Sequence, residues 1–371
     1  MRAACLVAAV GAWLGLFLGA SAATAAAADV AGLARSVARP WPDLQRADGS
    51  FPDEVAEIAR EPRDPYGNAM LGYALLDHGL REGDEQSISS ALRAVGYAIR
   101  HPDVGHRAIF EDLPLASAYN LARARLADDP RFTALRADWE ARLRRIRLVG
   151  IGGPRPYFNW YLVEAVAILE LLRTGIDPGA ESGSVLAQPA ESARVVEDLI
   201  NRELPATVRR YTRDDLRAGP LTIVSDPPHN PPAYHAFSLG LLARGLELLG
   251  PRASTASRDL LDRAVRASWA LAAPDGDLAY FGRSQEQSWA LAMTAYGAET
   301  AARLPGIAAE QAARYTAVSE RVLGRLRELH LDDRGLSITP ALRRDLANGV
   351  RGLDGYVSAS AYGGLTLVGL N

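Results

Sequence analysis

The sequence predicts an all-α fold, an (α/α) toroid of about 10–12 helices with minor β-hairpin elements, and three observations support this prediction. Apolar residues recur at three- and four-residue steps along most of the chain, which is the period of an amphipathic helix. Short breaks that contain Pro, Gly and Asp separate these segments. No repeat of fixed period is found, which disfavours an open solenoid and favours a closed ring of antiparallel helix pairs.

The first residues are typical of an export signal. Arg2 precedes an apolar run over residues 6–18, and small residues follow it up to Ala28. The apolar run is too short for a comfortable membrane span, so we expect cleavage and no stable membrane anchor. We therefore assign residues 1–28 to a signal peptide and residues 29–371 to a single toroid domain. The protein is expected to be secreted, or periplasmic where the source has an outer membrane.

Composition excludes several kinds of chemistry. The only cysteine, Cys5, lies in the predicted signal, which removes thiol nucleophiles, disulfides and Cys-based zinc sites from the mature chain. The 41 basic residues are all arginine, so Schiff-base catalysis, covalent pyridoxal phosphate and a P-loop lysine are excluded. The net charge of -3 gives no nucleic-acid footprint. We expect no cofactor, no metal and a monomer.

Helices are expected wherever the apolar period persists, and Pro- or Gly-containing breaks such as Gly250-Pro251 end them. Alternating residues at 278–281 and 336–339 are the strand candidates, and 177–192 is the most loop-like insertion. In chain order the expected helices cover residues 66–80, 88–99, 113–126, 132–146, 158–172, 190–200, 233–249, 254–271, 285–302, 308–329 and 358–370.

Polar and aromatic residues collect where three of these helices begin. Before and within the helix at 158–172 stand Tyr157, Asn159 and Trp160, with Glu164 five residues after Asn159. An Asn at such a position is often a helix cap. Its aromatic company favours a second interpretation, in which the rings stack on sugar faces.

The second group precedes the helix at 233–249. Four prolines surround His229 and Asn230 and preset the backbone of this loop, and Tyr234 and His235 fall in the first helical turn. Two histidines and a tyrosine offer a general base and a general acid. A structural Pro-rich turn is the alternative, and the spacing fits no trusted zinc motif.

The third group precedes and opens the helix at 285–302. Ser284 and Gln287 have the spacing of a capping box, which leaves Arg283 outside the helix and able to grip a carboxylate. A solvent-facing arginine is the alternative. The other candidate residues of this group are Tyr280, Gln285, Glu286 and Trp289.

In their order along the chain, these residues resemble the (α/α)-toroid polysaccharide lyases, which include hyaluronate, chondroitin and xanthan lyases and single-domain alginate lyases. Asn159-Trp160-Tyr161 followed by Glu164 is similar to a run of that group. His229 with Tyr234, and Arg283 about fifty residues later, follow the order of its catalytic residues. The resemblance covers residues 157–289 and does not assign a subfamily.

The resemblance implies β-elimination on an acidic polysaccharide or oligosaccharide that contains uronate. By this resemblance Asn159 would neutralise the uronate carboxylate, helped by Arg283 and Gln285, because the carboxylate's charge makes the neighbouring carbon-bound proton weakly acidic. His229 would be the base, and Tyr234 the base or the acid, with its pKa lowered by Arg283. His235 and Tyr280 are substitutes for these roles. Tyr157, Trp160, Glu164, Asn230, Glu286 and Trp289 are the remaining candidates for substrate binding.

Two alternatives remain open at this point. The first is a glycoside hydrolase on the same toroid, which would use two carboxylates. Its candidates are Glu164, Asp226, Asp275, Asp277 and Glu286. The second is a protein that binds glycans without turning them over, in which the aromatic residues would matter and His229 and Tyr234 would not.

Overall fold

The computed structural model describes residues 30–53, 66–102, 108–148, 158–179, 181–211, 221–224, 232–278, 284, 287–332, 335–338 and 358–371. The predicted signal peptide lies outside these residues. No helix in the described ranges is both long enough and apolar enough to cross a membrane.

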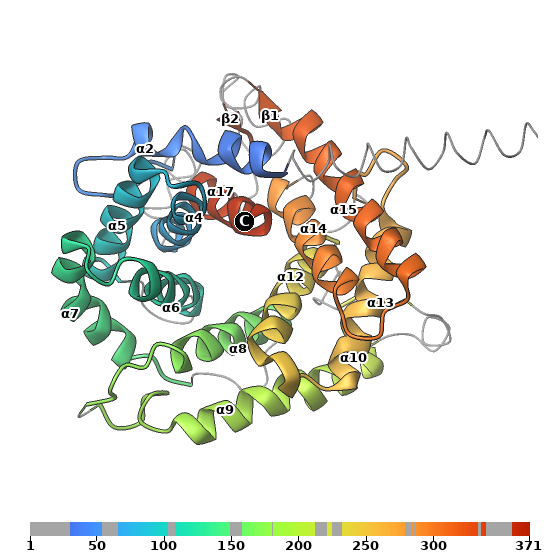
Figure 1. Cartoon of the computed structure of the whole chain (residues 1–371). Coiled ribbons are helices and arrows are strands. Elements are labelled where there is room, and N and C mark those ends of the chain that lie inside the picture. Colours follow the sequence, from blue (N-terminus) through green and yellow to red (C-terminus); the bar gives the residue numbers. More distant parts are fainter. Residues whose placement is uncertain are drawn as a thin grey trace, which may run out of the picture.

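Six helices form a closed inner ring (Figure 1). Each packs on the next around the ring, and the last, α17, packs on the first, α4. Rings from the first turns of neighbouring inner helices touch, for example Phe110 with Trp160 and Tyr234 with Trp289, so these helices start at the same end of the ring. In chain order the inner helices are α4 (Gly67–Glu82), α6 (Ala108–Arg125), α8 (Phe158–Leu172), α12 (Pro232–Leu249), α14 (Ser288–Ala302) and α17 (Ala359–Leu370).

A second layer of helices surrounds the ring (Figure 1). These helices are apolar on the side that faces the ring and polar outside, the pattern of a surface helix. A π-helical turn at Leu199–Glu203 joins α9 to α10, and a short 3-10 turn at Gly250–Arg252 joins α12 to α13. The outer helices are 30–38, α2 (Trp41–Leu44), α5 (Glu85–Arg100), α7 (Pro130–Arg144), α9 (Pro189–Asp198), α10 (Leu204–Tyr211), α13 (Thr255–Leu271) and α15 (Ala309–His330).

This arrangement is an (α/α) toroid, which confirms the predicted fold class. Within the described residues the predicted β content is one small hairpin, in which β1 (Leu331–Asp332) pairs antiparallel with β2 (Gly335–Leu336). Of the strand predicted at 336–339, Leu336 lies in β2, residues 337 and 338 are not in a strand, and residue 339 lies outside the described part of the chain. Of the strand predicted at 278–281, Leu278 forms an isolated bridge with Ala272, and residues 279–281 lie outside the described part of the chain.

Glycines in α17 let the ring close. A Cβ atom at Gly364 would lie 2.8 Å from the backbone nitrogen of Leu71 in α4, and one at Gly369 would lie 2.8 Å from the backbone of Ala292 in α14. These distances are shorter than any normal contact of a side-chain carbon, so only glycine permits this approach. The last helix thus packs backbone to backbone between α4 and α14.

A buried ion-pair cluster connects the two layers. Arg142 of α7 binds Asp112 of α6 at 2.7 Å and Glu111 of α6 at 3.1 Å. The side chain of Glu111 is completely buried, and that of Arg142 is 13% exposed. These two carboxylates of the inner helix α6 therefore form ion pairs with the outer helix α7.

Candidate functional site

The candidate site lies at the end of the toroid where the six inner helices begin, which we call the mouth. The structure brings Asn159, Tyr234 and Trp289 to this end, because each lies in the first turn of an inner helix. Trp160, Glu164 and His235 are the other described candidates, and all three belong to α8 or α12. The remaining candidates, Tyr157, His229, Asn230, Tyr280, Arg283, Gln285 and Glu286, lie outside the described residues.

An aromatic side chain lies at the start of each inner helix, in its first turn or, for α4, at the residue just before it, and together these six residues form what we call the aromatic collar. Their rings form two connected arcs. In the first, the ring centroids of Tyr66 and Phe110 are 5.3 Å apart and those of Phe110 and Trp160 are 5.8 Å apart. In the second arc, the ring centroids of Tyr234 and Trp289 are 5.9 Å apart and those of Trp289 and Tyr362 are 5.8 Å apart. The collar consists of Tyr66, Phe110, Trp160, Tyr234, Trp289 and Tyr362.

Exposure divides the collar into accessible and supporting rings. Tyr66, Phe110, Trp160 and Tyr234 are partly exposed, so their rings can meet a ligand. Trp289 is 2% exposed and touches the rings of Tyr234, Phe237 and Tyr362. In this structure it therefore supports the collar from within the core.

Asn159 is the second residue of α8, so it lies in the first turn of the helix. Its side chain is 1% exposed, and its Oδ1 atom has no hydrogen-bond partner among the described residues. A buried amide oxygen without a partner costs free energy, on the order of 1–3 kcal/mol. Glu164, five residues further along α8, is also buried. Asn159 thus has hydrogen-bonding capacity left for a ligand.

Tyr234 is held by Ser284. The Ser284 hydroxyl donates a hydrogen bond to the phenol oxygen of Tyr234 over 3.2 Å. Ser284 has a φ of 57°, and it is the only non-glycine residue with positive φ in the described part of the chain. The predicted capping role of Ser284 is therefore wrong: α14 begins three residues later than expected, at Ser288, with Gln287 before it.

His235 is fixed inside the protein. Its Nδ1 atom accepts a hydrogen bond from the Val224 backbone N–H at 3.0 Å, so Nε2 carries the proton and lies 3.1 Å from both the Ala264 carbonyl and the Ser268 hydroxyl. Burial lowers the pKa of His235 to about 4. Both ring nitrogens are thus engaged in joining residues 221–224 to α12 and α13, and neither is available to a substrate in this structure.

The mouth carries few carboxylates among the described residues. Of the six inner helices, only α6 has an acidic residue in its first turn, Glu111, and that residue is bound to Arg142. Each helix start carries about half a positive charge. The buried carboxylate of Asp53 already accepts a hydrogen bond from the Ser360 backbone N–H at the start of α17. The starts of α4, α8, α12 and α14 have no acidic residue in their first turns, and these four favour an anion at the mouth. Asp275 and Asp277, candidates for a hydrolase pair, bind Arg325 of the outer helix α15.

Sequence reasoning missed four residues of this region: Tyr66, Phe110, Ser284 as a partner of Tyr234, and Tyr362. A signal for the aromatic residues was present, because Tyr66 stands where an apolar period begins and Phe110 and Tyr362 lie within four residues of such a start. It becomes informative only once the inner helices are distinguished from the outer ones. No group of His, Cys, Asp and Glu in the described ranges has the arrangement of a metal site.

No family model matches the sequence, and no curated protein is detectably similar to it. Solved structures with the same fold are found. An α-1,6-mannanase, GH76A, from Salegentibacter sp. HEL1_6 superimposes with a TM-score of 0.57 at 13% identity, over 92% of this chain and 98% of its own. A possible member of family GH105 from Salmonella enterica serovar Paratyphi A gives a TM-score of 0.59 at 13% identity, over 92% of each chain. A polysaccharide lyase gives 0.50 at 14% identity, over 92% of this chain and 96% of its own. At such identities the likeness establishes the (α/α) toroid alone.

Proposed function

We propose that this protein is a secreted polysaccharide lyase that cleaves a uronate-containing polysaccharide by β-elimination. The observation that carries the proposal is the composition of the mouth, where a collar of aromatic rings surrounds the helix starts and four of these starts, those of α4, α8, α12 and α14, have no acidic residue in their first turns. The rings suit the apolar faces of sugars, and the helix starts suit their carboxylates. An acidic glycan meets both requirements.

The reaction makes two demands on such a site. A base must take the proton from the carbon next to the uronate carboxylate, and an acid must protonate the sugar oxygen that leaves as its bond to carbon breaks. The first step builds negative charge on the carboxylate, so hydrogen-bond donors and positive dipoles there lower the barrier. Asn159 is the described side chain best suited to this position, because it is an amide at a helix start with hydrogen-bonding capacity to spare.

Tyr234 is the described side chain suited to proton transfer. It is partly exposed, and it belongs to the collar. The hydrogen bond from the Ser284 hydroxyl fixes the position of its phenol oxygen. His229 and Arg283, which lie outside the described residues, remain part of the proposal as base and as carboxylate partner.

The test is incubation of the purified mature protein with alginate, hyaluronate, chondroitin, xanthan and polygalacturonate. A lyase leaves an unsaturated sugar at the new end, so absorbance in the ultraviolet rises together with the number of reducing ends. Tyr234→Phe should abolish the rise and leave the fold intact. Release of saturated products only, or of none from any of these polymers, would overturn the proposal.

A glycoside hydrolase is the second candidate, since two of the structures named above are described as a mannanase and a possible GH105 member. A variant of that mannanase with two consecutive aspartates replaced is described as inactive. The consecutive acidic pair at the start of an inner helix here, Glu111 and Asp112, is instead bound to Arg142. Reducing ends formed without new ultraviolet absorbance, and lost in Glu164→Gln, would favour this alternative.

Export is the remaining part of the proposal. Expression of the full-length chain with a C-terminal tag should give a protein outside the cytoplasm that has lost about 28 residues. N-terminal sequencing of the exported protein checks the cleavage point. Retention of residues 1–28 on a cytoplasmic product would contradict this part alone and would leave the proposed chemistry untouched.

A further inference from the structure

A cavity of about 390 Å³ lies inside the ring towards the end opposite the mouth. Most of its polar lining comes from the C-terminal halves of the inner helices, with Asp77 and Arg81 from α4, Arg244 and Glu247 from α12, and Tyr296 from α14. The residues of the candidate site stand at the other ends of these helices. We call this hollow the rear cavity, and nothing in the proposed reaction uses it.

Half of the side chains that line the rear cavity are polar and half are apolar. The apolar part includes Met70, Phe237, Met293 and Leu365. A purely apolar ligand would strip water from the polar groups without replacing their hydrogen bonds, which is costly. A purely ionic ligand would leave the apolar part uncovered. The lining therefore fits a ligand with one apolar face and one hydrogen-bonding edge.

The charges around the rear cavity neutralise one another. Each arginine that lines it is paired with a carboxylate: Arg81 with Asp77 at 3.0 Å, Arg244 with Glu170 at 2.5 Å, and Arg303 with Glu247 at 3.6 Å. No guanidinium lining the cavity thus lacks a carboxylate partner, and an anionic or cationic ligand would have to break one of these pairs. A neutral ligand can bind without doing so.

The polar groups are also held in position before any ligand arrives. The buried carboxylate of Glu170 accepts hydrogen bonds from Arg244 and from the side chain of Asn120. The hydroxyl of Tyr296 donates to Glu247 at 2.5 Å. Burial raises the pKa of Tyr73 to about 12, so its hydroxyl remains a neutral donor and acceptor. Fixed donors and acceptors reduce the entropy that binding must overcome.

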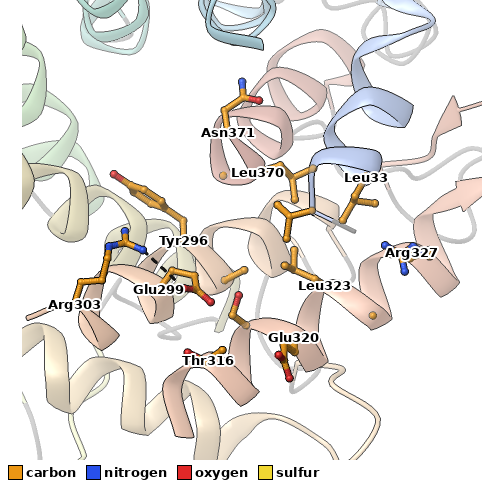
Figure 2. A pocket seen from close by; sticks show the side chains of 15 residues that line it. Leu33, Tyr296, Glu299, Arg303, Thr316, Glu320, Leu323, Arg327, Leu370 and Asn371 are labelled. Atoms are coloured by element: carbon orange, nitrogen blue, oxygen red, sulfur yellow. Dashed lines mark ion pairs between the residues drawn. The ribbon is translucent and has the colours of Figure 1, made fainter. Parts of the chain in front are cut away.

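A second hollow adjoins the first and extends it. A groove of about 430 Å³ runs between α14, α15 and the helix at 30–38, and Tyr296, Arg303 and Asn371 line both hollows. Figure 2 shows Tyr296, Arg303 and Asn371 along one side of this groove and Glu320 and Arg327 on the far side. A ligand longer than the rear cavity could therefore continue past Tyr296.

We propose that the rear cavity is a second glycan site, which binds a neutral oligosaccharide at the end of the toroid opposite the mouth. A pyranose ring has an apolar face of C–H groups and an edge of hydroxyls, which is the division found in the lining. The rings of Tyr73 and Tyr296 supply the stacking surfaces, and Asp77, Arg244 and Glu247 supply partners for hydroxyls. The site is separate from the proposed reaction and does not depend on it.

The test is calorimetric titration of the mature protein with maltotriose, cellotriose and xylotriose. At least one should bind, and Tyr296→Ala should weaken that binding on the order of tenfold, as expected for loss of an aromatic contact. Tyr296→Phe keeps the ring and should weaken binding of the trisaccharide less than Tyr296→Ala does. Trp160→Ala, in the collar, is the matched control and should leave binding of the trisaccharide unchanged. Thermal unfolding of each variant verifies that it is folded.

Three results would overturn the inference. One is absence of binding of all three sugars at millimolar concentration by a folded protein. Another is loss of binding in Trp160→Ala but not in Tyr296→Ala, because the sugar would then occupy the mouth. The third is binding of decanoate or decylammonium in place of the sugars, which would assign the cavity to an amphipathic ion. None of these results bears on whether uronate polymers are cleaved at the mouth.

Discussion

The Ser284 hydroxyl donates its hydrogen bond to Tyr234 from a backbone conformation that serine seldom adopts. At a φ of 57° a side chain with a Cβ costs on the order of 1–2 kcal/mol relative to glycine. A strained residue of this kind is common at functional sites. The strain and the hydrogen bond can be separated by two substitutions at the same position.

Ser284→Gly should relieve the strain and lose the hydrogen bond. We expect a free energy of unfolding that is unchanged or raised by about 1 kcal/mol, together with turnover lowered on the order of tenfold. The pH dependence of turnover should also change, because the phenol oxygen of Tyr234 loses a hydrogen-bond donor. Urea denaturation and a pH–rate profile measure these quantities.

Ser284→Ala is the control, since it keeps the strain and loses the same hydrogen bond. Its pH–rate profile should match that of Ser284→Gly, whereas its free energy of unfolding should be lower. Equal stability of the two variants would show that the backbone is not strained. An unchanged pH–rate profile in both would show that Ser284 does not act on Tyr234.

The second prediction concerns acid stability and His235. Burial lowers the pKa of this residue from 6.5 in the unfolded chain to about 4 in the folded protein, so the unfolded state binds more protons between these values. Its contribution to stability is fully present above pH 6.5 and is lost as the pH falls through about 4. The shift corresponds to about 3 kcal/mol. The slope of the unfolding free energy against pH reports the difference in bound protons between the unfolded and folded states. We expect this difference to be smaller by about one proton in His235→Asn than in the parent protein within this pH window.

His101→Gln is the matched control, because the His101 side chain is exposed. It should leave the slope as it is in the parent protein. Some slope will remain in His235→Asn, since burial also lowers the pKa values of His78 and His330. A slope in His235→Asn equal to that of the parent would show that His235 is already protonated in the folded state.

The sequence predicted the helices well and the geometry of the site less well, for physical reasons. The helix at Phe158–Leu172 was predicted with its observed bounds, because its apolar residues start and stop sharply there. The start of α14 was misplaced because a capping-box pattern does not reveal that Ser284 adopts positive φ. The helix at 30–38 and α10 were missed, since their short apolar patterns are weak.

The collar could not be predicted from local patterns, because it depends on closure of the ring. Phe110 and Trp160 are fifty residues apart and meet only because α6 and α8 are adjacent inner helices that run in the same direction. His235 shows the converse case. Its place beside Tyr234 in the sequence suggested chemistry, whereas the helix turns it towards Ala264 and Ser268 in the core.

The third prediction tests closure of the ring through glycine. Gly364→Ala would place a Cβ atom against the backbone of Leu71, which cannot move without separating α17 from α4. We expect a loss of about 1–3 kcal/mol in the free energy of unfolding. Gly324→Ala, in α15, is the control, since nothing lies within 4 Å of the added atom. That substitution should stabilise the protein by about 0.5–1 kcal/mol.

Urea denaturation of both glycine variants measures the difference, which should have opposite signs at the two positions. Helix propensity alone would make alanine favourable at both. A stabilised Gly364→Ala protein would therefore show that α17 and α4 are not in backbone contact.

The last prediction concerns the ion-pair cluster between the two layers. Burial alone would lower the pKa of Arg142, and the carboxylates of Asp112 and Glu111 more than offset this effect. Arg142→Met removes a positive charge that pairs with both of these buried carboxylates, and we expect a loss of about 3–5 kcal/mol in the free energy of unfolding. Arg136→Met breaks an exposed pair with Glu140 in the same helix and should cost less than about 1 kcal/mol.

Neutralising the cluster as a whole gives a different expectation. In the triple variant Glu111→Gln, Asp112→Asn and Arg142→Met no buried charge is left unpaired, so most of the stability lost in Arg142→Met should return. If the proposed lyase chemistry is correct, this triple variant also retains elimination activity, because neither carboxylate takes part in it. Loss of turnover in a triple variant of normal stability would instead assign Glu111 or Asp112 to the reaction and favour hydrolysis.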